Sequence, residues 1–490
     1  MHEGSGDSNV PVAMLPVGGR PTVSAFVAWA WLTILLSACG ALDNGRSGER
    51  GRTFESISED PEQPIADASM REAMQARVGQ ARVGPFESEN GVTAQVDPGT
   101  ILPIVFIHGA AGSAHQYLSQ AMRWTQNGYP SDLVHAFEYD GSRAGVDPAV
   151  EDLSAFVQDL LETTDGYGQV YLVAHGRGTT VAAAYLADSQ HLPNVAKYVA
   201  IDGAPCPLTV ACLTLTQRIL PGQGHVEVAS SAESFSMQHA FLLEQTPDAT
   251  RIEPALGPVS VAGRMVAFAS NAGDAGGSVD FYPVDAQTGE RMTPEPVASG
   301  TVGEGGHFGP VMVDGQVHYE IVAIERGEDL AQHFYLQPLL QGTTLLRLPA
   351  AGQDSEWYAH SRRGDGHANL VALRMREWRQ RDVLEVEPAA GRSGQGPVDV
   401  MSEMVGDESI VLHMQDAADA RQRSTLDALP WFPEQRLQAG IDVYLKASNP
   451  PDGTITLTHY PEGGADQSQT LSFPNWSSSK HSIVAVFMPD

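Results

Sequence analysis

One stretch, from Val170 to Thr180, constrains what this chain can fold into more than any other. It reads VYLVAHGRGTT and passes from an apolar, β-branched run, through His175-Gly176-Arg177, into the alanine-rich run Val181–Leu186. This pattern predicts a strand, a tight turn and a helix. In the G-x-S-x-G form of such a turn, a central serine presents its hydroxyl at the end of the strand. Here the frame is Ala174 to Gly178, and the central position is Gly176.

Strand and helix patterns alternate on both sides of this stretch. Short apolar runs predict strands at Ile101–Ile107, Leu133–Tyr139, Lys197–Ile201 and Val210–Leu215. Helical spacing of apolar residues predicts helices at Ala114–Gln126, Ala149–Thr164 and Ala232–Glu244. Alternation of this kind predicts an α/β domain over residues 101–246, with a mostly parallel sheet covered by helices on both faces.

The pattern changes beyond residue 247, where short alternating runs are separated by turns rich in Gly, Asp and Asn. The predicted strands are Val259–Ala269, Ser278–Pro283, Val317–Ile324, Phe334–Pro338, Thr343–Leu348, Leu370–Arg374, Val383–Val386, Ser409–Met414, Ile441–Lys446, Thr454–Tyr460 and Ile483–Phe487. They predict an all-β region, a sandwich or a barrel. We expect two β domains, 247–340 and 341–490, with a break near Leu340.

The N-terminus resembles an export signal. An apolar segment of signal-peptide length, Val23–Leu36, follows Arg20 and ends in Ser37-Ala38-Cys39. This ending resembles a bacterial lipobox, which predicts a signal peptide over residues 1–39 and a lipid anchor on Cys39. The alternative is an ordinary signal peptide with a chance cysteine. Residues 40–100 are polar and predict a flexible tether, so we expect an exported lipoprotein held at a membrane, in the periplasm or at the cell surface.

Composition excludes some classes of partner. The 490 residues include 29 Lys and Arg against 60 Asp and Glu, which gives a net charge of −31. Nucleic-acid binding requires basic patches that displace counterions, so we expect no nucleic-acid partner. No Cys/His spacing typical of a metal site occurs, and we expect neither metal nor cofactor. Cys206 and Cys212 are either a small disulfide or two buried thiols.

The order of polar residues in the α/β domain suits acyl transfer. That reaction needs a nucleophile, a general base, an acid that orients the base, and backbone donors for the oxyanion. Gly176 occupies the nucleophile position, Asp202 follows the next strand, and His225 lies in a glycine-rich loop. The backbone N–H groups of Ala110, after His108-Gly109, and of Arg177 would form the oxyanion hole. Singly, Asp202 could cap a loop and His225 could be a turn histidine; the joint order favours a site.

Residues 102–245 resemble the α/β-hydrolase lipases and esterases, in particular an archaeal long-chain lipase with a C-terminal β-domain and its bacterial relatives. The resemblance is carried by Pro103–Ser113, Asn127–Pro130, Phe137–Asp140, the turn at Gly176, Val195–Val199, Asp202-Gly203 and Gly224–Val226. It implies that Asp202 and His225 take the acid and base roles, with Ala110 and Arg177 as oxyanion donors. It also implies that the β region adjoins the site.

This chain departs from the family at the nucleophile. Gly176 has no side-chain oxygen, so no acyl-enzyme can form there. Thr179 and Thr180 lie about a turn further along the helix and should point away from the oxyanion hole. The resemblance therefore implies a lipase- or esterase-like protein for hydrophobic esters such as acylglycerols, with weak or absent turnover. The alternative is a catalytically inactive surface lipoprotein that binds a lipid or ester.

Overall fold

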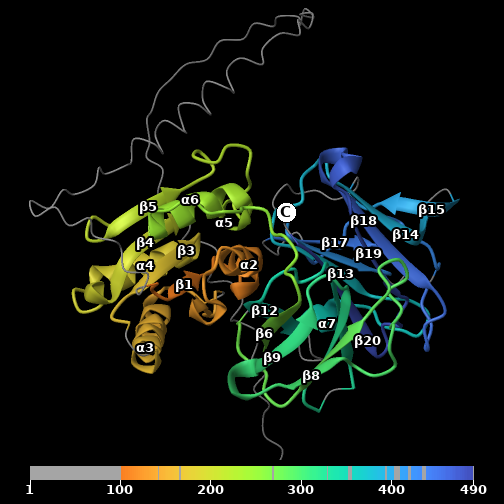
Figure 1. Ribbon diagram of the computed structural model, residues 1–490. Coiled ribbons are helices and arrows are strands. Elements are labelled where there is room, and N and C mark those ends of the chain that lie inside the picture. The colour runs from red at the N-terminus through yellow and green to blue at the C-terminus, as the bar shows by residue number, and fades with distance from the viewer. Residues whose placement is uncertain are drawn as a thin grey trace, which may run out of the picture. The chain divides into compact units, whose positions relative to one another are not determined.

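The computed structural model of the protein describes residues 101–488 except 142, 165–166, 268–269, 328, 351–355, 392–393, 402–408, 418–420 and 433–436 (Figure 1). All described residues belong to the unit formed by residues 94–490. The predicted signal peptide, Cys39 and the predicted tether lie outside the described residues. Within the described ranges, no helix has the length and apolar character needed to cross a membrane.

The α/β region contains one parallel sheet. Its strands are ordered β2-β1-β3-β4-β5, with bounds β1 Ile104–Ile107, β2 Val134–Phe137, β3 Val170–His175, β4 Val195–Ile201 and β5 Ala211–Leu215. The central strands are buried along their whole length, which explains their continuous apolar composition. The connecting helices are η1 Ala114–Tyr117, α2 Leu118–Gln126, η2 Ser131–Leu133, α3 Asp147–Thr163, α4 Arg177–Ala187, η3 Leu192–Asn194, α5 Glu227–Ser230 and α6 Ala232–Leu243.

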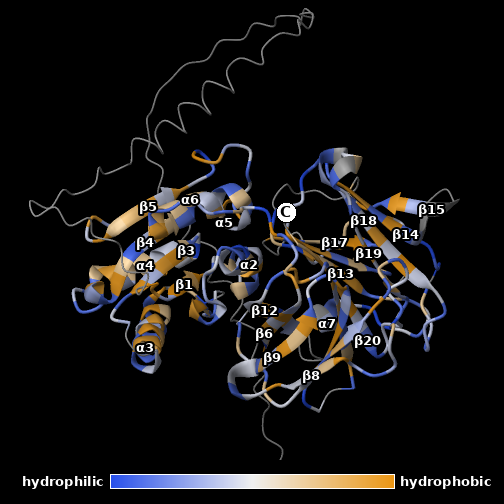
Figure 2. Cartoon of the chain, viewed as in Figure 1, coloured by the Kyte–Doolittle hydropathy of each residue, from blue (hydrophilic) through white to orange (hydrophobic). Residues whose placement is uncertain are grey.

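Helices cover both faces of this sheet, which confirms the predicted fold class. Val105 and Ile107 of β1 pack in one core with helices α3 and α4. Ile104 and Phe106 face the other core, with Trp124 of α2 and with α6. Helix α3 shows the matching two-sided character in Figure 2, where hydrophobic and hydrophilic residues share its surface.

The rest of the chain is almost entirely strands, as predicted. They are β6 Pro258–Ala267, β7 Ser278–Pro283, β8 Ala298–Thr301, β9 His307–Asp314, β10 Tyr319–Ile324, β11 Ala331–Leu336, β12 Thr343–Ala350, β13 Leu370–Arg374, β14 Val383–Gly391, β15 Gly394–Asp399, β16 Val411–Gln415, β17 Gln438–Asp442, β18 Thr454–Tyr460, β19 Gln469–Pro474 and β20 His481–Phe487. Short helices are η4 Glu304–Gly306, α7 Glu356–His360, η6 Pro461–Gly463 and η7 Ala465–Gln467.

These strands form three sheets, and each of the two smaller sheets packs against the largest one. The eight-stranded sheet has the order β17-β16-β13-β20-β11-β10-β7-β8. Along β20, Val484 and Val486 face a core shared with the three-stranded sheet β12-β6-β9. The alternate residues Ile483 and Ala485 face a second core, shared with the four-stranded sheet β15-β14-β18-β19. The β region is therefore layered, with the large sheet between the two smaller ones.

The predicted division of the β region near Leu340 stays a prediction, and the eight-stranded sheet contains strands from both sides of it. β11, which precedes Leu340, pairs in parallel with β20 at the end of the chain, and Phe334 lies opposite Val484. Strands from both predicted domains thus belong to one sheet. The alternating pattern of a strand shows which face is buried but not which strand is its neighbour, so the sequence could not indicate this pairing.

The α/β and β regions share their cores. Leu118 and Met122 of α2 pack in the core of the β region, and Leu345 of β12 packs in a core of the α/β region. Glu138, which follows β2, is buried and contacts Arg264 at 2.5 Å and Arg347 at 2.8 Å. Although burial opposes ionisation, these two guanidinium groups hold the pKa of Glu138 below its ordinary value.

Candidate active site

The turn between β3 and α4 places Gly176 at the carboxyl edge of the parallel sheet. Gly176 has φ 51° and ψ −121°, a backbone conformation that favours glycine. Its N–H donates to the carbonyl of Ile201 in the neighbouring strand β4, at 2.9 Å. β1 lies between β2 and β3, so the strand order reverses beside this turn, where α/β sheets commonly bind ligands.

Asp202 and His225 come together at the same edge. Asp202 directly follows β4, and its Oδ2 lies 2.7 Å from Nδ1 of His225, which precedes α5. The opposite ring nitrogen of His225 faces the turn, because a Cβ built on Gly176 would lie 3.1 Å from Nε2. A serine at position 176 would therefore carry its hydroxyl beside the nitrogen that acts as base in a Ser-His-Asp triad.

The loop after β1 brings the predicted oxyanion donor Ala110 into the same cavity as Arg177 and Gly176. Neither the N–H of Ala110 nor that of Arg177 donates to another described residue. His108 is buried below this loop, accepts from the N–H of Tyr139 at 3.2 Å and contacts the carbonyl of Gly109 at 2.8 Å. Burial lowers its pKa, so His108 is a neutral support of the loop.

Asn271, from the β region, also holds this loop and was not identified from the sequence. Its side-chain amide donates to the carbonyl of Gly112 at 2.8 Å and to that of Tyr139 at 3.2 Å. Asn271 follows β6, far from the loop in sequence, with φ 58°. Nothing local in its sequence distinguishes it from other turn asparagines, which often adopt this conformation.

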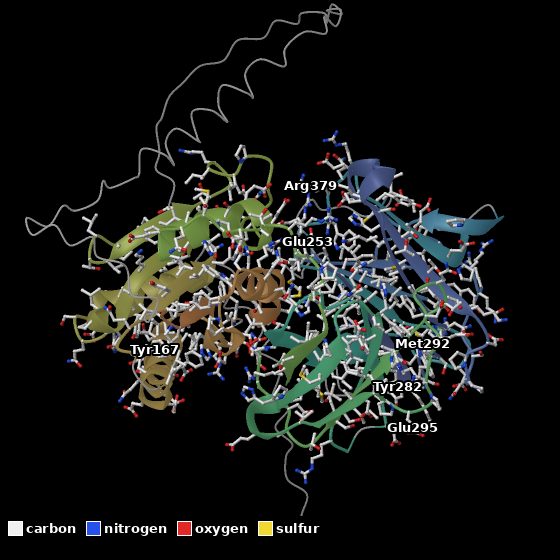
Figure 3. All side chains as sticks on the ribbon, viewed as in Figure 1. Tyr167, Glu253, Tyr282, Met292, Glu295 and Arg379 are labelled. Carbon is white, nitrogen blue, oxygen red and sulfur yellow. A yellow bond between two sulfur atoms is a disulfide. The ribbon has the colours of Figure 1, made fainter. Side chains whose placement is uncertain are left out.

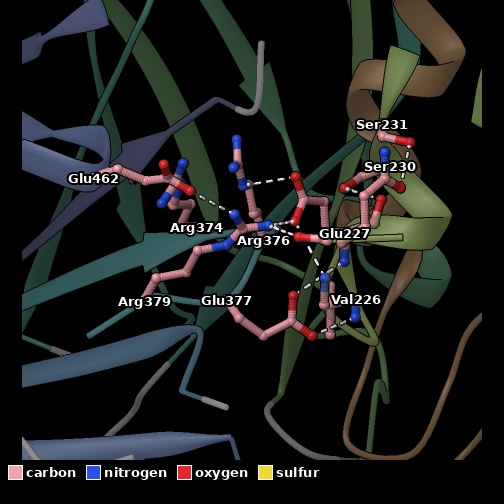
Figure 4. Close-up of polar contacts among 12 residues, drawn as sticks. Val226, Glu227, Ser230, Ser231, Arg374, Arg376, Glu377, Arg379 and Glu462 are labelled. Atoms are coloured by element: carbon pink, nitrogen blue, oxygen red, sulfur yellow. Dashed lines mark hydrogen bonds and ion pairs between the residues drawn. The ribbon is translucent and has the colours of Figure 1, made fainter. Parts of the chain in front are cut away.

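Glu377 holds the loop that carries His225 (Figure 4). Its carboxylate accepts hydrogen bonds from the N–H of Val226 and, at 3.1 Å, from the N–H of Glu227. Glu377 follows β13 in the β region and is 3% exposed. Burial raises the pKa of its carboxyl, while the two N–H donors act in the opposite direction. The β region therefore holds the two residues that follow His225 in the chain.

Arginines surround this contact. Arg376 binds the carboxylate of Glu227 at 2.9 Å, and Arg379 binds the same carboxylate and, at 2.9 Å, that of Glu462. Figure 3 labels Arg379 among the side chains of the β region, and Figure 4 shows its bonds. Arg379 also donates to the carbonyl of Gly222, which precedes His225. Ion pairs and hydrogen bonds thus hold the loop on both sides of the histidine.

The polar side chains next to Gly176 bond to nearby backbone groups or line the cavity. Thr179 donates from its hydroxyl to the carbonyl of Gly176 at 2.6 Å and accepts from the N–H of Ala204 at 2.5 Å. Thr180 is exposed and contributes to the cavity wall. His175, which the sequence did not single out, contacts the carbonyl of His225 through Nε2 at 2.8 Å, and the two rings lie 4.4 Å apart. His175 therefore supports the histidine from the strand side.

A cavity of about 810 Å³ opens at this edge and is lined by both regions. The α/β region contributes Gly176, Asp202, His225 and the loop after β1. The β region contributes mostly apolar side chains, which include Val371, Leu373, Met375, Ile410, Val411, Trp431, Leu437 and Val484. The α/β strand ends thus supply the reactive groups, and one face of the large β sheet supplies an apolar wall suited to a hydrocarbon chain.

Cys206 and Cys212 form a disulfide, with their Cα atoms 5.9 Å apart. The bond joins the loop after Asp202 to β5. Among the described residues, no group of His, Cys, Asp and Glu side chains is arranged to hold a metal ion.

Two family models match the β region. Residues 257–351 match the model described as the lipase C-terminal domain. Residues 357–490 match a model of another C-terminal domain. With the parallel sheet and the strand-end site on the N-terminal side, these matches decide the fold class. The chain has an α/β-hydrolase fold followed by a β-rich region.

Solved structures similar to this α/β-hydrolase chain include a gene product and two enzymes. The lin2722 product of Listeria innocua is 16% identical, over 30% of this chain and 96% of that one, with a TM-score of 0.25. A pyrethroid hydrolase from Sphingobium faniae JZ-2 is 22% identical, over 23% of this chain and 49% of that one, with a TM-score of 0.17. Phospholipase PlaB from Legionella pneumophila is 8% identical, over 79% and 93%, with a TM-score of 0.20.

This chain spans about half the length of the pyrethroid hydrolase. No curated protein matches it.

Proposed function

We propose that this protein is a lipase- or esterase-like α/β-hydrolase that binds hydrophobic carboxylic esters and hydrolyses them slowly. The observation that carries the proposal is His225, whose Nε2 faces position 176 while its Nδ1 contacts Asp202 at 2.7 Å. Asp202 stabilises the imidazolium that forms when Nε2 accepts a proton. The apolar cavity wall supports a substrate with a long hydrocarbon part.

In this proposal a water molecule beside Gly176 takes the place of the serine hydroxyl. His225 accepts a proton from the water through Nε2, and the hydroxide attacks the ester carbonyl carbon. The carbonyl oxygen becomes negatively charged and accepts hydrogen bonds from the N–H groups of Ala110 and Arg177. When the C–O bond to the alcohol breaks, the alkoxide takes the proton from His225. The products are a carboxylic acid and an alcohol.

The expected rate is low. Enzymes that lose a triad member retain roughly 10³–10⁴-fold acceleration over water from the oxyanion hole and from binding. Gly176 removes the nucleophile but leaves those two contributions in place. Hydrolysis by the wild type should therefore be detectable and far slower than that of a serine hydrolase.

A second candidate is a surface lipoprotein that binds a lipid or ester without turnover. Gly176 favours it, because a side chain at φ 51° is strained and costs roughly 1–3 kcal/mol. Serine hydrolases accept this strain to place the nucleophile. Glycine at this position stabilises the turn and gives up the hydroxyl, which suits a protein that keeps the pocket for binding.

The test compares Gly176→Ser with Gly176→Ala on p-nitrophenyl esters of increasing chain length. Both variants carry the strained side chain, and we expect both to lose roughly 1–3 kcal/mol of stability. The serine variant alone should show a burst and a gain of at least about 10³-fold in hydrolysis. A serine variant that folds but gains nothing contradicts the inferred acyl-transfer geometry.

A third variant separates the two candidates. His225→Ala should abolish the slow hydrolysis by the wild type if that histidine activates water. Unchanged hydrolysis would refute the water mechanism. Binding without turnover is supported instead if the wild type hydrolyses the esters no faster than buffer alone while its thermal midpoint still rises with added fatty acid.

We further propose that a lipid on Cys39 anchors the exported protein at a membrane. The proposal rests on the lipobox-like Leu36-Ser37-Ala38-Cys39. Cells fed an alkyne-labelled fatty acid should label the wild type and not Cys39→Ala, and the variant should move to the soluble fraction. Equal labelling of both proteins would exclude this site.

A further inference from the structure

The floor of the cavity changes from apolar to polar along the strands of the large sheet. In β20, Ser482 and Val484 lie on one face, and both line the cavity. Gln332 of β11 lies opposite Ser482 and also lines the cavity. His413 of β16 lies opposite Val371 of β13 on the same face. A plain hydrocarbon chain offers these polar groups no hydrogen bond.

Ser482 is the clearest of these groups. It is 4% exposed, and its hydroxyl has no hydrogen-bond partner among the described residues. Most buried hydroxyls in native proteins have a partner, and one left alone in a cavity wall often marks the place of a ligand or of water.

Two further amide oxygens lie just before strand β13 and in strand β16, outside the residues that line the cavity. Asn369 and Gln415 flank the register pair Leu370–Met414 and are 1% and 5% exposed. Their side-chain nitrogens donate to the carbonyls of Arg362 at 2.9 Å and His360 at 3.3 Å, which assigns the oxygen of each amide. Neither of these oxygens has a hydrogen-bond partner among the described residues.

The hydroxyl of Ser482, which lines the cavity and has no partner among the described residues, defines the chemistry of the complementary group. It can both donate and accept a hydrogen bond. A ligand hydroxyl matches both capacities, whereas a ketone, an ether or a second ester carbonyl can only accept.

We propose that the cavity selects acyl chains that carry a hydroxyl away from the carboxyl end, with Ser482 as the residue that recognises it. The proposal rests on the proposed function, because the carboxyl end must lie at His225 for the hydrocarbon to cross the apolar wall and for the hydroxyl to reach Ser482. The substrate class is then esters of hydroxylated long-chain acids.

The experiment measures binding of free acids to the full-length wild type by calorimetry. The probes are octadecanoic acid, a series of octadecanoic acids with one hydroxyl at successive carbons, and the ketone matching the best hydroxy acid. At least one hydroxy acid should bind about tenfold more tightly than octadecanoic acid, as expected for one added hydrogen bond in a dry site. The ketone, which can only accept, should bind less tightly than the matching hydroxy acid.

Two variants of strand β20 test whether Ser482 recognises the hydroxyl. Ser482→Ala should remove the preference for the hydroxy acid and leave the affinity for octadecanoic acid unchanged. Val484→Ala, which widens the apolar wall, should weaken both acids by similar factors and preserve their ratio. Thermal midpoints of the two variants show that each is folded.

The outcomes separate this proposal from the function on which it rests. If octadecanoic acid binds but no hydroxy acid binds more tightly, hydroxyl selection is refuted and the hydrophobic ester site stands. If the preference survives in Ser482→Ala, the recognition by this residue is refuted. If none of the acids binds, both proposals are overturned.

Discussion

The α/β region and the β region contribute to the same cavity in different ways. In the α/β region, Gly176, Asp202 and His225 follow one another along a short stretch of chain and meet because parallel strands end at one edge. In the β region, Asn271 and Glu377 follow two separate strands, β6 and β13, and reach across to the loops of the site. The comparison teaches that the reactive groups are local in sequence, whereas the groups that hold them are not.

The two regions are joined by shared cores and by a buried ionic contact. The α/β sheet and the large β sheet have different cores, but α2 and β12 each pack in the core of the other region. The buried contact of Glu138 with Arg264 and Arg347 crosses the same boundary. A β region that merely follows the hydrolase would tolerate loss of these contacts. The predictions below test this dependence, beginning with the largest effect.

Glu138→Gln should cost the most stability. The change leaves the buried guanidinium group of Arg347 and the partly buried one of Arg264 without their carboxylate. Breaking a buried ion pair in this way costs about 3–5 kcal/mol. Denaturant unfolding should show this loss, and hydrogen exchange should show lower protection in strands of both regions. If only the strands of one region lose protection, the two regions are energetically independent.

The control for this prediction is an exposed pair in the α/β region. Arg143, whose side chain is 72% exposed, contacts Asp140 at 3.0 Å. Exposed pairs contribute at most about 1 kcal/mol. Arg143→Ala should therefore unfold almost as the wild type does.

Acid should destabilise the β region in two pH windows. Burial lowers the pKa of His481 to about 4 from 6.5, so the unfolded chain binds this proton first and stability falls as the pH drops from 6.5 to about 4. Burial opposes ionisation of Glu320, but His333 and Arg291 lower its pKa to about 2 from 4.5. Its contribution, on the order of 3 kcal/mol, is present above pH 4.5 and is lost as the pH falls toward 2.

Denaturation measured across this range should separate the two groups. His481→Gln should flatten the loss of stability between pH 6.5 and about 4, and Glu320→Gln should flatten it between pH 4.5 and about 2. Parallel profiles for the wild type and both variants would show that the acid sensitivity arises elsewhere, for example at Glu138 between the regions.

Glu377→Gln should have the smallest effect on stability and a clear effect on rate. A glutamine presents one acceptor and one NH₂ to the two N–H donors of Val226 and Glu227, so one donor loses its partner at a cost of about 1–3 kcal/mol. In the Gly176→Ser background we expect kcat to fall about tenfold with KM nearly unchanged, because the His225 loop is less well positioned.

Glu462→Gln is the matched control for this prediction. Glu462 belongs to the same cluster and bonds Arg379 at 2.9 Å, and its side chain is 46% exposed. We expect no change in kcat for this variant. A similar loss of rate in both variants would mean that the cluster acts through its net charge and not by holding the loop.

Much of the α/β region could be predicted from the sequence. The helix expected at Ala149–Thr164 is α3, Asp147–Thr163, because its apolar spacing is regular and Pro148 suits its first turn. The strand β9, by contrast, was not predicted. Pro310 interrupts its alternating pattern, and the strand tolerates this proline because it lies at the edge of the three-stranded sheet.

The sequence by itself determined the alternation of strands and helices and the order Gly176, Asp202, His225, because these depend on local periodicity and on residues that follow single strands. Only the tertiary structure decided the pairing of β11 with β20, the support of the site by Asn271 and Glu377, and the cavity floor that ends at Ser482. These features join segments far apart in the chain, and the pattern within a strand carries no information about which distant strand will be its neighbour.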